Sequence, residues 1–198
     1  MVIEPVLLSI IVGKLRKGKF NNLEKIYLRG WYLLLIAALT QFLSSLMKGY
    51  GIRIGGLEFE DYFYYIHIAS YLLMLVCIVL NLKKKSMKLF LIGLILNFIV
   101  IFANGGKMPV SLTGIKGIKE EVAVELPMSD FDIKHQAVTP DTKFVYLADI
   151  ILIPEPYPLP KILSLGDIFI MGGLFVFLQE AMLMEKDELG KIKYRFKN

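Results

Sequence analysis

Long hydrophobic stretches with few or no acidic or basic residues alternate with short clusters of lysine and arginine along this chain. Segments such as YLLMLVCIVL and LFLIGLILNFIVIF lack the polar stripe at the helical period that a half-exposed helix of a soluble domain carries. A helix of about 20 apolar residues is long enough to cross a bilayer. The pattern therefore predicts transmembrane helices over residues 30–47, 62–82, 89–106 and 162–183.

The first hydrophobic segment, residues 1–13, is shorter and contains Glu4 and Pro5. At roughly 1.5 Å per residue, a helix of this length reaches about 20 Å, which is less than the hydrocarbon thickness. The segment crosses with local thinning, extends its reach through a snorkelling Lys14, or lies half-inserted, and we adopt the short crossing. The predicted fold class is an all-α integral membrane bundle of four to five transmembrane helices, a single domain over residues 1–198.

Basic residues are divided unevenly between two sets of connecting segments. Residues 14–29, 83–88 and 184–198 carry 15 of the 23 lysines and arginines, although they form the shorter set. Residues 48–61 and 107–161 carry the other eight. The positive-inside rule places the first set in the cytoplasm, so that the loop 107–161 is extracytoplasmic and the C-terminus is cytoplasmic.

Composition narrows the class of protein further. The chain is 56% hydrophobic with a mean hydropathy of +0.58, and its charged fraction of 21% lies below the roughly 25% of soluble domains. The net charge of +5 does not indicate nucleic-acid binding, because the basic residues lie in short clusters beside hydrophobic stretches. Cys77 is the only cysteine, which excludes an internal disulfide and a CxxC site. The first basic cluster follows the first hydrophobic stretch, the reverse of a cleavable signal peptide.

The loop 107–161 contains patterns typical of ordered structure. EVAVEL (121–126) alternates, which favours a strand edge, and FVYLADIILI (144–153) favours a strand or an interfacial helix. PEPYPLP (154–160) has proline at every second position, which predicts an extended, polyproline-like path. We expect this run to lie over the outer surface of the bundle and to lead into the last helix.

Polar residues within the predicted helices are the first place to look for a function, because hydrocarbon does not solvate them. Asn97 and Asn104 are seven residues apart on one helix face, and two glycines end that helix. Ser164 and Asp167 form an S-x-x-D capping box at the start of the last helix. These groups are predicted to converge on one outward-facing polar pocket. Its ligand-binding candidates are Gln41, Asn97, Asn104, Gly105, Gly106 and Asp167.

Each candidate also has a purely structural interpretation. Asn97 and Gln41 are of the type that joins neighbouring helices by hydrogen bonds. An acid in the first turn of a helix, such as Asp167, interacts favourably with the helix dipole without any ligand. The sequence leaves both interpretations open.

Metal and cofactor chemistry have little support in the sequence. DFDIKH (130–135) combines two acids with His135, which are side-chain types that bind divalent ions. One histidine with two acids is a weak pattern, and we expect neither a metal nor another cofactor. No G-x-S-x-G, H-E-x-x-H, P-loop or Gly-rich dinucleotide motif is present.

Several motifs together resemble those of a known family. They are N-G-G-x-M-P (104–109), His135, L-A-D-I (147–150) before the proline-rich run, and S-x-G-D (164–167). This combination is similar to a family of small bacterial membrane proteins, the domain of unknown function 5317, with Ala148 where that family is expected to have glycine. The similarity covers most of the chain, from the second hydrophobic segment to about Leu183.

The resemblance implies a multi-pass protein of the bacterial plasma membrane and implies no particular activity. It also implies that Asn104, His135, Asp149 and Asp167 belong to one linked set. It adds nothing on the ligand, the reaction or the oligomeric state.

Two functional hypotheses follow. The first is a non-enzymatic membrane protein that binds a small molecule, a lipid headgroup or a partner protein at the outer polar pocket. The alternative is a membrane-embedded enzyme for a lipid-linked or hydrophobic substrate, with His135 as general acid or base and Asp149 or Asp167 as the second group. A transporter has less support, because no inverted repeat is evident and five spans form a thin wall unless the chain is a homo-oligomer.

Overall fold

The computed structural model describes residues 2–49, 53–54, 57–111, 134–158, 160–186 and 192–194. Most of these residues are helical, as the hydrophobic pattern predicts. The strand predicted at 121–126 and the acids Asp130 and Asp132 lie outside the described residues.

The helical elements, in chain order, are α1 (Ile3–Leu15), the 3₁₀ segment η1 (Phe20–Lys25), α2 (Trp31–Gly49), α3 (Phe59–Leu80), α4 (Lys85–Ala103), the 3₁₀ turn η3 (Val145–Leu147) and α7 (Leu165–Met182). The short strands are β1 (Arg53–Ile54), β2 (Leu57–Glu58), β3 (Met108–Val110), β4 (His135–Ala137), β5 (Ile151–Ile153), β6 (Lys161–Leu163), β7 (Met184–Lys186) and β8 (Ile192–Tyr194). The strands pair two by two at the ends of the helices.

Within the described part of the chain, three helices are long and apolar enough to cross a membrane: Tyr62–Leu80 in α3, all of α4 and all of α7. They coincide with three of the four predicted spans. The predicted span over residues 30–47 coincides with α2, in which the shorter stretch Trp31–Ser44 is apolar. That α2 and α1 each cross a membrane stays a prediction.

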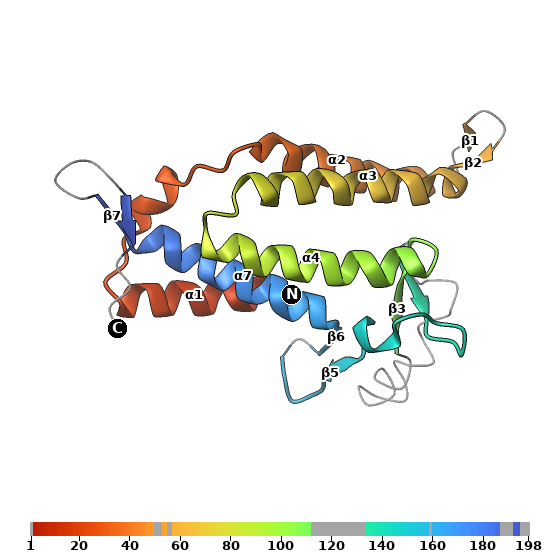
Figure 1. Cartoon of the computed structure of the whole chain (residues 1–198). Helices are drawn as coiled ribbons and strands as arrows, with labels where there is room; N and C mark the ends of the chain where they lie inside the picture. Colours follow the sequence, from red (N-terminus) through yellow and green to blue (C-terminus); the bar gives the residue numbers. More distant parts are fainter. Residues whose placement is uncertain are drawn as a thin grey trace.

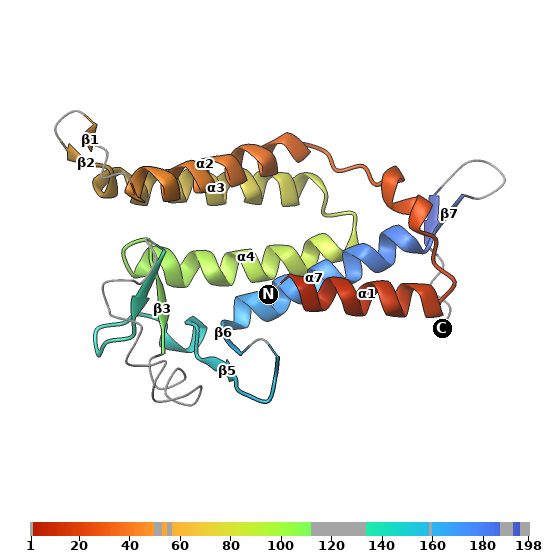
Figure 2. The ribbon, with the colours of Figure 1, turned by 180° about the vertical axis from the view of Figure 1, so that it is seen from behind.

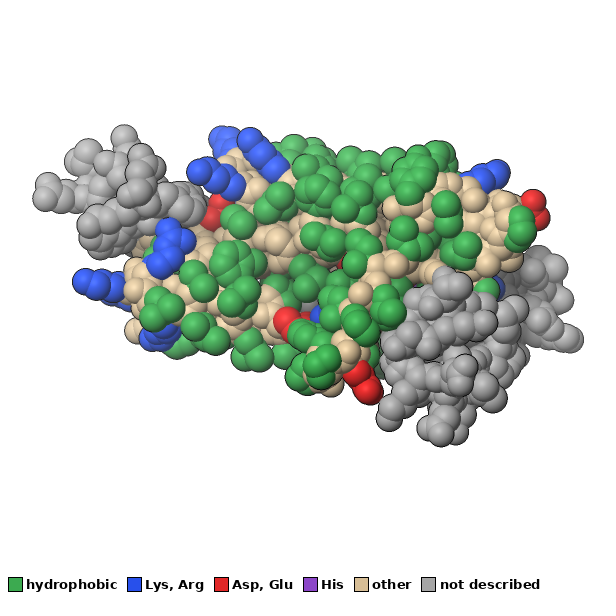
Figure 3. All heavy atoms as spheres, turned by 90° about the horizontal axis from the view of Figure 1, so that it is seen from below, with side chains coloured by type: hydrophobic (Ala, Val, Ile, Leu, Met, Phe, Trp, Pro, Cys, Tyr) green, Lys and Arg blue, Asp and Glu red, His purple; other side chains and the backbone are tan. Residues whose placement is uncertain are grey.

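The helices form two layers (Figures 1 and 2). In one layer α7 lies between α1 and α4, and in the other α2 and α3 pair side by side. The packing of α3 on α4 joins the layers. The C-terminal ends of α1 and α7 and the α3–α4 turn lie at one end, which we call the basic end, and β3 to β6 lie at the other, the cap end. Figure 3 shows lysine and arginine side chains gathered toward the basic end and a mainly hydrophobic middle.

Small residues bring α1 close to α7. Ser9 and Gly13 are buried one turn apart, and a Cβ atom on Gly13 would lie 2.6 Å from the sulfur of Met182. Gln179 Nε2 donates to the Ser9 carbonyl at 2.6 Å, and Ser9 Oγ donates to the Phe175 carbonyl at 3.0 Å. Small residues with hydrogen bonds across the seam are typical of helices that pack within a membrane. The 13-residue α1 is therefore an integral part of the bundle.

The cap end also reaches the start of α1. Lys161 Nζ forms a salt bridge with Glu4 Oε1, and the Tyr157 hydroxyl donates to the same oxygen at 3.2 Å. An acid near the end of a short apolar helix is costly in hydrocarbon unless it is paired. The β5–β6 hairpin supplies that partner.

Residues 154–158 of the proline-rich run lie in the turn between β5 and β6, and the extended path predicted for them is wrong. β5 and β6 pair antiparallel, with Leu152 opposite Ile162, and the Tyr157 N–H donates to the Pro154 carbonyl at 3.2 Å within the turn. The reason is nonlocal. Pairing of β5 with β6 gives the backbone N–H and C=O groups of both segments their hydrogen-bond partners. The local geometry of proline does not predict this pairing.

Residues 144–153 contain a short strand, which is one of the two predicted alternatives, after a three-residue 3₁₀ turn. A 3₁₀ turn at η3 is followed by Asp149, which forms an isolated parallel bridge to Val110, and then by β5. Strand β3 pairs on its other edge with β4, also in parallel. The cap is therefore built around β3, directly beyond the end of α4.

Candidate functional site

A closed hydrogen-bond network joins α4 to the start of α7. Ser164 Oγ donates to Asn97 Oδ1 at 3.0 Å, and Asn97 Nδ2 donates to Asp167 Oδ1 at 3.1 Å. The Asp167 N–H donates to Ser164 Oγ at 3.0 Å, and the Ser164 N–H donates to Asp167 Oδ2 at 3.1 Å, which confirms the predicted capping box. All three side chains are buried. The structure thus gives Asn97 and Asp167 helix-joining and capping contacts.

Two glycines set the spacing of this crossing. A Cβ atom on Gly93 would lie 2.5 Å from the Gly166 carbonyl oxygen, and a Cβ atom on Gly166 would clash with Asn97 Oδ1. Small residues at a helix crossing let the backbones approach closely. The network depends on that approach, because its side chains are short.

Asn104, Gly105 and Gly106 turn the end of α4 into the cap. Asn104 Nδ2 donates to the Lys143 carbonyl at 2.9 Å, and the Lys143 N–H donates to Asn104 Oδ1 at 2.9 Å. Gly105 and Gly106 have φ values of 73° and 83°, a region that glycine adopts without steric cost. The Gly106 carbonyl accepts from His67 Nδ1 at 2.9 Å. These three predicted ligand residues attach the cap to α3 and α4.

Asp149 is a buried carboxyl group with an unused acceptor. Its N–H donates to the Pro109 carbonyl at 3.0 Å, and its carbonyl accepts from the Ser111 N–H at 2.9 Å, which fixes its backbone along β3. The residue is only 8% exposed, and Oδ1 has no hydrogen-bond partner within the described part of the chain. Such atoms are rare, because an unpaired buried polar atom costs free energy.

The surroundings of Asp149 disfavour its charge. Burial first, and the negative charge of Asp167 second, raise the pKa of Asp149 from 3.8 to about 7. Tyr71 on α3 interacts electrostatically with both acids and packs on the hydrophobic cluster that contains Ala148. Asp149 therefore changes its protonation state near neutral pH, at a point where α3, α7 and the cap meet.

His135 lies on the opposite edge of β3 from Asp149. His135 pairs with Met108 in the β3–β4 ladder, whereas Asp149 forms a bridge to Val110. The backbone hydrogen bonds from β3 to β4 and those from β3 to Asp149 lie on opposite edges of β3. Two strand spacings, roughly 10 Å, therefore separate the two backbones. His135 lies close enough to His67 for their charges to interact.

Gln41, the remaining ligand-binding candidate, and two buried serines lie on α2 and α3. Gln41 is on α2, which packs against α3, and its Oε1 is buried without a partner among the described residues. The hydroxyls of Ser44 and Ser70 donate to carbonyls of their own helices at 2.7 and 3.0 Å. The structure brings Asn97 together with Asp167 and places Asp149 near Asp167. The convergence of all the candidates on one outward-facing pocket stays a prediction.

No three histidine, cysteine, aspartate or glutamate side chains among the described residues are placed to hold a metal ion together. The two acids of the DFDIKH segment lie outside those residues. The expectation that the chain binds no metal stays a prediction.

Sequence reasoning missed Tyr71. The sequence does contain a signal, because Tyr71 follows His67 by four residues and so shares its helix face. The two ring centroids are 5.1 Å apart. A tyrosine and a histidine on one face in the middle of an apolar helix are a more direct sign of a site at the cap end than Tyr65, which is exposed.

Comparison with known proteins places the chain in a family without assigning an activity. Residues 25–179 match the family of unknown function DUF5317, as the motifs predict. An uncharacterized protein of Thermotoga maritima is 28% identical over 177 residues, which cover 89% of this chain and 89% of that protein. No solved structure matches the chain.

Proposed function

We infer a function from geometry, on the premise that this chain belongs to the family of unknown function DUF5317. The proposed function is non-enzymatic binding by a multi-pass protein of the bacterial plasma membrane. Its ligand is a small molecule or lipid headgroup with a primary ammonium group, and Asp149 at the cap end receives that group.

Hydrophobic side chains on the outside of the helices support insertion into a bilayer. A water-soluble bundle would present a polar face there. Exposed side chains of this kind on the first three helices include Leu7, Leu8, Ile11, Leu35, Leu39, Phe42, Leu72 and Val79.

Aromatic side chains support the same placement. Tyr27 and Trp31 lie near the basic end, whereas Tyr65 and Tyr146 lie near the cap end, and each is more than half exposed. Tyrosine and tryptophan are enriched at both membrane interfaces. The lysines and arginines of the basic end then favour a cytoplasmic location for that end and an extracytoplasmic location for the cap.

The observation that carries the binding proposal is the unused Oδ1 of Asp149. A primary ammonium group supplies N–H donors, which form short charge-assisted bonds with a carboxylate. The nearby Asp167 makes the site unfavourable for an anion and favourable for a cation, because a positive ligand relieves the repulsion between the two acids. The Tyr71 hydroxyl is a further polar group near the site.

The enzymatic alternative has less support. It needs His135 beside an acid, but β3 lies between His135 and Asp149, and both carboxylate oxygens of Asp167 already accept hydrogen bonds from the protein. A general acid or base must lie within hydrogen-bond reach of its partner and substrate.

Ethanolamine tests the binding proposal directly. At pH 8, where Asp149 is mostly ionised, we expect ethanolamine at about ten times its dissociation constant to raise the melting temperature of the purified protein by about 4 °C. Asp149→Asn is expected to abolish that shift. Choline at equal concentration is the control ligand, because its quaternary ammonium group has no N–H to donate. An absent shift in the native protein, or an equal shift in the variant, contradicts the proposal.

A further inference from the structure

A hydrophobic cavity of about 330 Å³ lies between the two helix layers. Its walls come from α2, α3, α4 and α7, with Leu28 before α2, and they consist only of nonpolar side chains. It is about twice the size of an engineered apolar cavity of roughly 150 Å³ that stays dry and takes up benzene. Water finds no partners in such a space, and an empty space forfeits dispersion contacts, so hydrocarbon is the favoured occupant.

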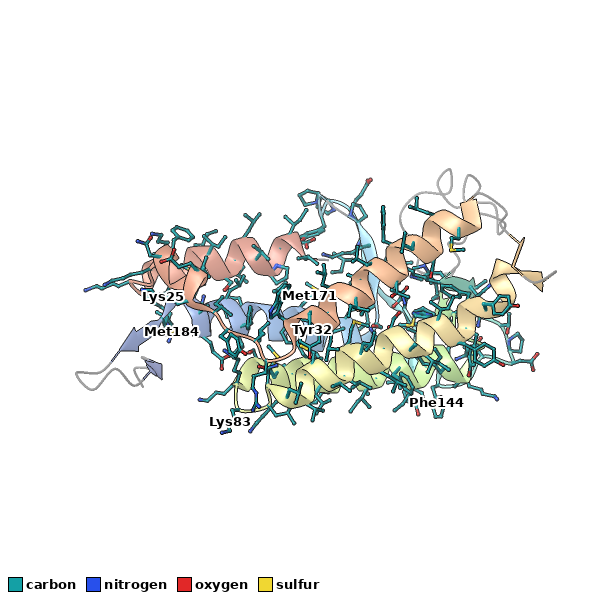
Figure 4. The ribbon with its side chains drawn as sticks, turned by 90° about the horizontal axis from the view of Figure 1, so that it is seen from above. Lys25, Tyr32, Lys83, Phe144, Met171 and Met184 are labelled. Atoms are coloured by element: carbon teal, nitrogen blue, oxygen red, sulfur yellow. The ribbon has the colours of Figure 1, made fainter. Side chains whose placement is uncertain are left out.

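The cavity occupies the half of the bundle next to the basic end. Its lining residues lie between 74 and 78 near the end of α3, between 87 and 94 in the first half of α4, and between 170 and 177 around the middle of α7. Figure 4 shows α2 crossing over α7 close to this region, where Tyr32 and Met171 are labelled. The cavity therefore lies at the depth of the leaflet next to the basic end.

Basic side chains stand at the edge of this cavity. Lys84 lines a small pocket of about 10 Å³ that shares Phe177 with the cavity. Lys83, the residue before Lys84 in the α3–α4 turn, is exposed. Arg29 is also exposed, and it directly follows Leu28, which lines the cavity. This arrangement of an apolar chamber and a positively charged rim matches the two parts of an anionic lipid.

One acid, Glu180, also lines the small pocket, but both of its carboxylate oxygens already accept hydrogen bonds from the protein. Glu180 Oε1 accepts from the Lys85 N–H at 2.8 Å, and Oε2 accepts from the Ser86 hydroxyl at 2.6 Å. Glu180 thus caps the first turn of α4, where the free N–H groups favour a negative charge. The neighbouring lysines are left as the groups facing a ligand at this rim.

We propose that the cavity holds one acyl chain of an anionic phospholipid from the leaflet at the basic end, with the phosphate at Lys83 and Lys84. The membrane supplies this ligand laterally, so no opening to water is needed. The proposal rests on the membrane insertion proposed above and is independent of Asp149.

Native mass spectrometry of the full-length protein in detergent tests it, with equimolar phosphatidylglycerol and phosphatidylcholine as probes. Leu34→Trp fills the cavity, and Leu35→Trp is the matched control, because Leu35 is the next residue and is 49% exposed. We expect one phosphatidylglycerol retained by the native chain and by Leu35→Trp, and a loss of retention in Leu34→Trp. The double variant Lys83→Gln, Lys84→Gln is expected to keep lipid but to lose a roughly tenfold preference for phosphatidylglycerol.

Cys77 gives a second readout that needs no substitution. It is the only cysteine, is buried and lines the cavity. Its alkylation by N-phenylmaleimide is expected to be several-fold slower with phosphatidylglycerol than with phosphatidylcholine. Equal alkylation rates in the two lipids, or full lipid retention by a folded Leu34→Trp variant, overturn the proposal. Neither result bears on ethanolamine binding at Asp149.

Discussion

Replacing Gly166 with alanine is expected to lower the free energy of unfolding by about 3 kcal/mol. The new methyl group would overlap Asn97 Oδ1 and would lie 2.8 Å from the Gly93 carbonyl oxygen. Asn97 Oδ1 cannot move away alone, because Asn97 bonds to both Ser164 and Asp167. The Gly93 carbonyl oxygen belongs to the backbone of α4 and cannot move without the helix. The start of α7 would therefore separate from α4 and open the network. Thermal unfolding of the purified protein in detergent, followed by circular dichroism, measures the loss.

Gly172→Ala is the matched control in the same helix. A Cβ atom on Gly172 would meet no neighbouring atom within 4 Å, so alanine fits there without a clash. Removing a glycine from a helix interior is expected to stabilise α7 by about 0.5 to 1 kcal/mol. If both variants unfold like the native protein, the close crossing at Gly166 is not what holds α4 and α7 together.

The stability of the native protein is expected to fall as the pH rises from about 4 to about 7, and Asp149→Asn is expected to remove that fall. The folded protein holds the Asp149 proton up to about pH 7, whereas the unfolded chain releases it near pH 3.8. Between these values the folded state binds more protons, so stability decreases with pH, by at most roughly 4 kcal/mol in total. At pH 8 the neutral asparagine variant should therefore be the more stable protein.

Asp141→Asn is the control for this titration, because Asp141 lies in the same cap and is exposed. It should leave the pH dependence of the native protein unchanged. Denaturant or thermal unfolding at a series of pH values between 4 and 8 provides the comparison. A native protein whose stability rises across this range would show that Asp149 is ionised throughout it and has partners that stabilise its charge.

The sequence predicts the helices well where the signal is local. The runs at 62–82, 89–106 and 162–183 contain no proline, and α3, α4 and α7 occupy most of each run. α4 ends at Ala103, before its two glycines, and α7 begins at Leu165, after β6. The capping box of Ser164 and Asp167 is equally local, because its two residues are three positions apart. Family membership also followed from motif order along the chain.

The parts that escaped prediction depend on contacts between distant segments. Asn97 meets Asp167 only because Gly93 and Gly166 allow a close crossing, and no pattern within either helix specifies that register. The antiparallel pairing of β5 and β6 likewise overrides the extended conformation that alternate prolines favour. The position of Asp149 is set by β3, which lies about 40 residues earlier in the chain.

The central proposal is that the bundle crosses a membrane with its cap end outside the cell and its basic end in the cytoplasm. In a Cys77→Ala background, Asp141→Cys places a single thiol on the cap, and Lys83→Cys places one at the basic end; both positions are exposed in the structure. Intact cells are treated with a membrane-impermeant maleimide, and labelling is repeated after permeabilisation. We predict that the cap thiol is labelled in intact cells and the basic-end thiol only after permeabilisation. Labelling of the basic-end thiol alone in intact cells, or recovery of the chain in the soluble fraction, would contradict the account.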